Sequence, residues 1–291
     1  AKILHERALL IRENNYGKDN VIVAFTVDHL GRCYRALGEP EQAKILHERA
    51  FFVKEKHFGK EHSEIAINLG FLGNAHRDLG DLEKAKELHE KALIIKETFY
   101  GKGHVGLVSA IDELGEDYRC LGNIKKAKEL HELSLKIKEE YFDKNNIEVG
   151  LTLDQLGKVI DDVNLSKSIH ERALRIKRLY YEENHQNMSD TYMNIGNTYV
   201  KLGDYAKGIV FLEKALKVRE KYYSIDNLTL IEILISLSNL YIVKNDVNNA
   251  QKHLERALKI RQQYFGVEHK LTKEIEQIIA NLIKIESRNG N

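Results

Sequence analysis

The chain has 291 residues, of which 43% are hydrophobic and 31% charged, and its 45 lysines and arginines almost balance 44 aspartates and glutamates. The resulting formal net charge of +1 leaves no electrostatic footprint for nucleic acid or an anionic membrane. No apolar run approaches the roughly 18 residues of a membrane span, and the N-terminus lacks a signal-peptide pattern. The two cysteines form neither a disulfide framework nor a metal-ligand spacing, so we expect a cytoplasmic protein.

The eight residues AKILHERA occupy positions 1–8 and return unchanged at 43–50. Related segments recur along the whole chain, at spacings of 42, 42, 42, 39, 42 and 42 residues. A fixed period of this size indicates stacked repeats rather than two globular domains. The units start at Ala1, Ala43, Ala85, Ala127, Ser166, Gly208 and Ala250.

Each unit opens with a segment such as residues 85–101, whose apolar residues follow the period of a helix. A glycine often follows, where a helix C-terminus favours a residue that tolerates the left-handed conformation. The second segment, such as residues 108–122, is predicted to be another helix that carries L-G-x-x-Y, a pattern found at 30–34 and 114–118 and, with isoleucine in place of leucine, at 195–199. A glycine within a helix costs about 1 kcal/mol relative to alanine. Its recurrence predicts that two helices cross closely there, with the tyrosine filling the space beside it.

L-G-x-x-Y in one helix and A-x-x-x-(aromatic or His)-x-x-A-L in the next resemble the tetratricopeptide repeat (TPR) and not the HEAT pattern. The units are longer than the usual TPR, and the junction (Y/F)-G-x-x-H at 58–62, 100–104 and 265–269 resembles the kinesin light chain subgroup. The chain lacks the proline that this subgroup often carries after the junction histidine. The resemblance implies an all-α fold, a right-handed α–α superhelix (TPR solenoid) of about 14 antiparallel helices.

The resemblance covers residues 1–291 and predicts a single TPR solenoid. The last helix, expected at about 269–286, would cap the stack through Ile279, Ala280 and Ile283, and residues 287–291 would form a polar tail. Because the chain has no initiator methionine and begins within a motif, we expect a fragment of a longer protein. The fourth unit has a turn, VIDDVNLSKS (159–168), that is three residues short. Either a tighter turn absorbs this deletion, or the superhelix changes pitch there and divides the groove into halves.

Signatures of catalysis are missing from the sequence. HEKAL at 89–93 begins like the zinc motif H-E-x-x-H but has leucine in place of the second histidine. The Gly-Lys pairs lack the remainder of a P-loop, and no G-x-S-x-G or G-x-G-x-x-G occurs in a strand–turn–helix setting. We therefore predict a protein that is not an enzyme, with no catalytic residue, metal site or cofactor.

In TPR proteins the L-G-x-x-Y helices line the concave groove, so the resemblance places a partner there. Four residues after the glycine, arginine recurs in three successive units, and other polar residues stand one after and three before it. Asn194 and Asn197 match positions that hold the ligand backbone in peptide-binding TPRs. The candidate partner-binding residues are Asp28, Arg32, Arg35, Asn74, Arg77, Asp112, Glu116, Arg119, Asp154, Lys158, Asn194, Asn197 and Asn239.

The three arginines have two interpretations. They grip carboxylates of an extended peptide, since the guanidinium fork binds carboxylate bidentately, or they neutralise acidic residues of neighbouring helices. Those acidic residues are Asp28, Asp78, Asp112 and Glu116. The second half of the groove is more apolar, at Met193, Val200, Ile235, Ile242 and Val243. The arginines of the first half and the apolar residues of the second half would together suit an acidic peptide with a bulky apolar anchor. Kinesin light chains recognise motifs of this kind.

These observations predict a non-catalytic adaptor that binds a peptide or a partner protein, and neither nucleic acid nor a membrane. Two alternatives remain open. The chain could be the sensor or regulatory TPR region of a larger signalling or effector protein. It could also be a scaffold that self-associates through the ends of its superhelix.

One place in the opening helix of each unit holds histidine in five units and leucine in two. The TPR motif usually has an aromatic residue there, so we interpret the imidazole as a neutral ring in a core position. Successive copies, about 10 Å or more apart, are too far from each other to share a metal. The alternative is acid sensitivity, because charging buried imidazoles would cost stability at low pH. The residues are His5, His47, His89, His131, His170, Leu212 and Leu254.

Overall fold

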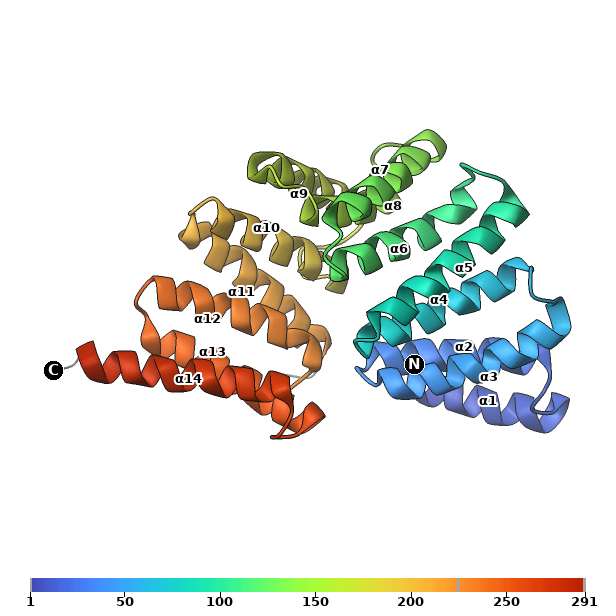
Figure 1. The fold of residues 1–291 in the computed structure, drawn as a ribbon, viewed down its shortest axis with the longest axis horizontal. Coiled ribbons are helices and arrows are strands. Elements are labelled where there is room, and N and C mark those ends of the chain that lie inside the picture. The colour runs from blue at the N-terminus through green and yellow to red at the C-terminus, as the bar shows by residue number, and fades with distance from the viewer. Residues whose placement is uncertain (1, 224–225, 290–291) are drawn as a thin grey trace. The chain divides into compact units, whose positions relative to one another are not determined.

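The computed structural model describes residues 2–223 and 226–289, and side chains up to residue 282. The regular secondary structure in these ranges consists of fourteen α-helices and three short 3-10 helices (Figure 1). The all-α prediction of about 14 helices is therefore confirmed. Within the described ranges, no helix combines the length and the apolar character needed to cross a membrane.

The chain forms two compact units, residues 1–159 and 160–291. The first unit contains a 3-10 helix, η1 (Val105–Leu107), and eight α-helices, each packed on the next. They are α1 (Lys2–Tyr16), α2 (Val21–Ala36), α3 (Pro40–Phe58), α4 (Ser63–Asp78), α5 (Leu82–Tyr100), α6 (Val108–Cys120), α7 (Ile124–Tyr141) and α8 (Ile147–Lys158).

The second unit contains six α-helices and two 3-10 helices, η2 (Gln186–Met188) and η3 (Leu228–Leu230). The α-helices are α9 (Val163–Lys177), α10 (Ser189–Lys201), α11 (Tyr205–Tyr222), α12 (Ile231–Val243), α13 (Val247–Phe265) and α14 (Lys270–Asn289). The last helix thus continues three residues past its expected end at 286, and the side chain of Ile283 lies outside the described residues. The boundary between the units falls within the short turn of the fourth repeat. The single solenoid and the change of pitch both stay predictions.

Even-numbered helices hold the L-G-x-x-Y segment or its equivalent and are called A-helices here, whereas odd-numbered helices are called B-helices. The recurring glycine brings each A-helix close to the B-helix that follows it. A Cβ built on Gly31 would lie 2.7 Å from His47 Cε1, and in the second unit one built on Gly196 would lie 2.9 Å from Leu212 Cγ. The predicted close crossing is confirmed, and the space beside the glycine is filled by the side chain at the histidine position.

The tyrosine of L-G-x-x-Y has another role than the predicted one. Its hydroxyl donates to a glutamate 28 residues earlier, on the preceding B-helix, as Tyr118 does to Glu90 at 3.0 Å. Tyr34, Tyr199 and Tyr241 make the equivalent bond. The tyrosine therefore joins its A-helix to the B-helix of the same unit, whereas the histidine packs its B-helix on the glycine of the preceding unit. His47, His89, His131 and His170 are at most 1% exposed, which agrees with a core position.

The junction histidines cap either the A-helices themselves, at α4 and α14, or the 3-10 helices η1 and η2 that lead into α6 and α10. His62 Nδ1 accepts the backbone N–H of Glu64 at 3.1 Å, and its ring stacks on Phe58 with 4.6 Å between ring centroids. His104, His185 and His269 make the same cap and the same stack. Asn20, Asn146 and Asn227 cap through a side-chain oxygen in the other units. A side-chain acceptor at this place satisfies a backbone donor that the helix itself leaves unpaired.

Candidate partner-binding face

Two of the predicted acidic residues lie between helices. Asp28 is 3% exposed; one carboxylate oxygen is 2.9 Å from His47 Nδ1 and accepts from Asn68 at 2.7 Å, and the other is 2.7 Å from Lys54 Nζ. Asp112 accepts from Lys138 at 2.8 Å. Each of these carboxylates binds its A-helix to the B-helix that follows it, Asp28 on α2 to α3 and Asp112 on α6 to α7. Asp154, the equivalent residue of α8, is also buried, at 4% exposure.

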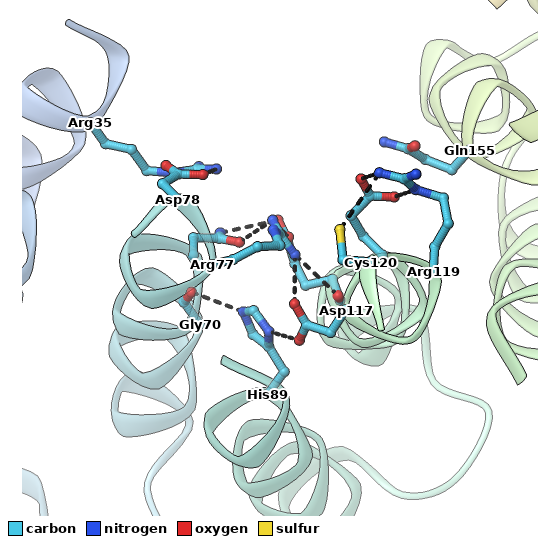
Figure 2. Close-up of polar contacts among 12 residues, drawn as sticks. Arg35, Gly70, Arg77, Asp78, His89, Asp117, Arg119, Cys120 and Gln155 are labelled. Carbon is cyan, nitrogen blue, oxygen red and sulfur yellow. Dashed lines mark hydrogen bonds and ion pairs between the residues drawn. The ribbon is translucent and has the colours of Figure 1, made fainter. Parts of the chain in front are cut away.

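Arg77 is bound to the next A-helix rather than left open to solvent (Figure 2). Its guanidinium donates to Glu113 Oε2 at 2.6 Å and to Asp117 Oδ1 at 3.0 Å, both on α6. It also donates to the side-chain oxygen of Asn74, whose own amide donates to Glu113. Partial burial favours the neutral form of Glu113, but the charge and hydrogen bonds of Arg77 outweigh this and hold the pKa of Glu113 below its ordinary 4.5.

Arg35 and Arg119 are paired as well, with side chains about one-third exposed. Arg35 Nε donates to Asp78 Oδ2 on α4 at 2.6 Å, and Arg119 binds Glu116 on its own helix at 2.7 and 2.8 Å (Figure 2). The geometry thus supports neutralisation by Asp78 and Glu116. Asp28 and Asp112, however, bind histidine and lysine instead of these arginines.

Two cations of the predicted set, Arg32 and Lys158, form no direct ion pair with a carboxylate among the described residues. Arg32 is exposed, with its guanidinium carbon 5.4 Å from the centroid of the Phe71 ring. Lys158 is half-buried and donates to the amide oxygen of Gln155 at 3.0 Å. The charge of Lys158 nevertheless acts on Glu116: burial favours the neutral form of that carboxyl, but Arg119 and Lys158 together outweigh this and hold the pKa of Glu116 below its ordinary 4.5.

In the second unit the three predicted asparagines differ in exposure. Asn194 is 5% exposed, and its amide nitrogen has no hydrogen-bond partner among the described residues. Asn197 is half-buried and Asn239 is exposed. Of the predicted apolar residues, Met193 belongs to the core of this unit, and Val243 is 57% exposed. The remaining three, Val200, Ile235 and Ile242, are partly buried against that core.

Sequence reasoning missed a periodic cation on the B-helices. Seven residues after the histidine position, a lysine or arginine reaches the start of the next A-helix, as Lys138 does when it donates to Thr152 at 2.8 Å. The available signal was a basic residue recurring with the period of the repeat on the face that also carries the histidine. The residues are Arg12, Lys54, Lys96, Lys138, Lys177, Arg219 and Arg261.

Paired antiparallel helices, the L-G-x-x-Y glycine packed on the next helix, and the period of about 42 residues define a helical repeat protein. A family model for the tetratricopeptide repeat matches residues 1–56, 63–140, 160–221 and 187–263. The chain belongs to the tetratricopeptide repeat family. No curated protein sequence matches it.

Several solved structures share this fold at 16–20% sequence identity. BtubC (BKLC) from P. vanneervenii aligns over 81% of this chain and 93% of its own, with 20% identity and a TM-score of 0.56. The TPR-like repeats of a P. anserina protein described as a kinesin light chain align over 70% of this chain and 99% of their own, with 18% identity and a TM-score of 0.53. The Cut9–Hcn1 structure aligns over 97% of this chain and 46% of its own, with 16% identity and a TM-score of 0.67. The fold is thus that of TPR proteins, including kinesin light chain-like ones.

Proposed function

We propose that this protein is a non-catalytic scaffold that binds a peptide or partner protein on the A-helices of its first unit. The observation that carries the proposal is the row of ion pairs Arg35–Asp78 and Arg77–Glu113, which joins α2 to α4 and α4 to α6. A row of polar side chains that is already ordered loses little conformational entropy when a partner binds. Membership of the tetratricopeptide repeat family supports the same role.

Within this face, the cations without a direct ion pair among the described residues are the first candidates for contact with the partner. Arg32 and Lys158 form no direct ion pair among the described residues, so an acidic group of a partner can bind them without breaking one; at Lys158 it would share the cation with Glu116. The arginines at 35, 77 and 119 order the side chains of this face through their ion pairs. They contribute to partner binding through the part of each guanidinium that stays exposed. The partner is accordingly an acidic segment. The two cysteines are unpaired, in keeping with a cytoplasmic setting.

The experiment is a peptide array probed with the purified chain. Acidic–aromatic peptides are compared with scrambled versions and with versions in which every Glu and Asp is replaced by Gln and Asn. We expect the acidic peptides to bind best, and the double variant Arg32→Glu/Lys158→Glu to lose that preference. Lys136→Glu, at a 73% exposed side chain on the B-helix α7, is the matched control and should bind as the wild type does. Equal binding of acidic, amidated and scrambled peptides would contradict the proposal.

A further inference from the structure

The buried lysines of α3 and α7 each have a carboxylate partner on the A-helix of their own repeat. Lys54 Nζ lies 2.7 Å from Asp28 and 3.1 Å from Glu64, and Lys138 Nζ lies 2.8 Å from Asp112 and 3.4 Å from Glu148. Lys138 also donates to the hydroxyl of Thr152. Two places in the repeat therefore supply carboxylates that neutralise this lysine, and a third supplies a hydroxyl acceptor to Lys138.

Lys96 on α5 stands at the same place, but all three of its partners are missing. The corresponding residues are Gly70, Gly106 and Ala110, which have no polar side chain. Lys96 is 7% exposed as a residue, and its ammonium group donates to Ser109 Oγ at 2.6 Å. Lys96 forms no ion pair with a carboxylate within the described residues. Burial lowers its pKa from the ordinary 10.5, with no opposing charge.

Space for the missing carboxylate remains at Gly70. A Cβ built on this glycine would meet no atom within 4 Å, and the residue itself is partly exposed. Figure 2 shows Gly70 on α4 above His89, whose Nε2 lies 3.1 Å from the Gly70 carbonyl oxygen. The nearby Asp117 is bound by both His89 and Arg77, so its carboxylate is already engaged.

We propose that the space beside Gly70 is a binding notch for one acidic side chain of the partner, whose carboxylate pairs with Lys96 as Asp28 pairs with Lys54. This inference rests on the proposed function and names one contact of it. A buried ammonium that lacks a counter-ion gains more from a carboxylate than a solvated lysine does, because little water screens the pair. The notch is therefore selective for Asp or Glu over the isosteric Asn or Gln.

The experiment uses acetate as the probe and the lysine side-chain carbon resonances of the full chain as the readout. Acetate is titrated at constant ionic strength, with chloride as the counter-titration, and Lys96→Met identifies the Lys96 signal. In the wild type we expect a saturable shift of that signal and a rise in the pKa of Lys96. The melting temperature should rise by about 2–4 °C at saturating acetate relative to chloride.

Two variants of nearly equal volume test the notch itself. Gly70→Asp supplies an internal carboxylate, so the Lys96 signal should start at its acetate-bound position and not respond to acetate. Gly70→Asn fills the same space without charge. The Lys96 signal should therefore not start at its acetate-bound position, and it should not shift when acetate is added. A wild-type titration identical with that of Gly70→Asn, or an acetate response retained in Gly70→Asp, would overturn the inference.

A peptide arm separates this inference from the function on which it rests. For an acidic peptide that binds in the array, Lys96→Met and Gly70→Asp should each weaken binding about tenfold, the effect of one charged hydrogen bond. Unchanged affinity in both variants would contradict the notch and leave the scaffold function intact. If no peptide binds, the scaffold proposal fails, and the acetate titration still decides whether the notch binds a carboxylate.

Discussion

Gly73 lies directly against the imidazole ring of His89: a Cβ built on Gly73 would be 2.5 Å from His89 Nε2. Gly70, three residues earlier in the same helix α4, would meet nothing within 4 Å. Both glycines carry the same intrinsic cost in a helix, so they differ only in what surrounds them. One glycine is required by packing, and the other leaves a space.

Substituting each glycine with alanine should change stability in opposite directions. Gly73→Ala should lower the free energy of unfolding by about 1–3 kcal/mol, because the new methyl group must displace the buried ring. Gly70→Ala should raise it by about 0.5–1 kcal/mol, because alanine loses less backbone entropy and has room. Urea unfolding followed by circular dichroism measures both. Equal effects would show that the contact between Gly73 and His89 does not constrain this position.

The contrast between these glycines shows how far a repeat can be predicted from its sequence. The period reveals which positions correspond, so the helix pairs and the close crossing at L-G-x-x-Y follow directly. Periodicity along one helix does not identify which residue of another helix fills a space. The sequence therefore suggested Tyr118 beside Gly115, whereas His131 occupies that place.

The predicted partner-binding face also shows that the pattern along one helix does not identify contacts with another helix. Position 28 lies at the border between the solvent-facing and the packed side of its helix, and a carboxylate is compatible with either. The buried cation on α3, Lys54, decides the matter, because it binds Asp28 from the packed side. Lys54 stands 26 residues away on another helix, so reading α2 alone cannot reveal the pair. Arg35 and Arg77 recur at one place of the repeat, so the sequence shows that they correspond, but their partners Asp78 and Glu113 depend on packing between A-helices.

Buried lysines with and without a carboxylate partner should respond differently to the same substitution. Lys54→Met leaves the buried Asp28 without its cation and should cost about 3 kcal/mol of stability. Lys96→Met removes a buried charge whose one polar partner among the described residues is Ser109, so we expect a change of less than about 0.5 kcal/mol, or a gain. Chemical denaturation of the two variants measures the difference. A loss in Lys96→Met as large as that in Lys54→Met would contradict this assignment.

The junction histidines can be tested as helix caps at His62. His62→Ala removes the acceptor for the Glu64 N–H and the ring stacked on Phe58, and should lower stability by about 1–2 kcal/mol. His62→Asn restores a capping oxygen, as Asn20 and Asn146 supply in other repeats, and should recover about half of that loss. Thermal unfolding of the three proteins measures the order. An asparagine variant no more stable than the alanine variant would mean that stacking, and not the cap, is the main contribution.

The pair of Arg77 and Glu113 makes a prediction about acid. In the wild type the pKa of Glu113 is below 4.5, so this carboxyl stabilises the fold above that pH and loses its contribution as the pH falls below it. In Arg77→Met, burial acts on Glu113 without the guanidinium and raises its pKa, so its ionised form costs stability at neutral pH and this cost disappears in acid. The variant should be less stable than the wild type by about 2 kcal/mol at pH 7, because water screens part of the interaction at the one-third exposed Glu113.

That deficit should shrink as the pH is lowered from 7 towards 3, since protonation removes the advantage that the wild type draws from the ion pair. Arg32→Met is the matched control, because Arg32 makes no ion pair among the described residues. Burial and the charge of Arg32 together lower the pKa of His29, so any pH dependence of the small effect of Arg32→Met should be confined to the range in which His29 titrates. Urea unfolding at intervals of half a pH unit measures the three stability curves. Parallel curves for the wild type and Arg77→Met would show that Arg77 acts through packing, because a purely steric contact does not depend on the protonation of Glu113.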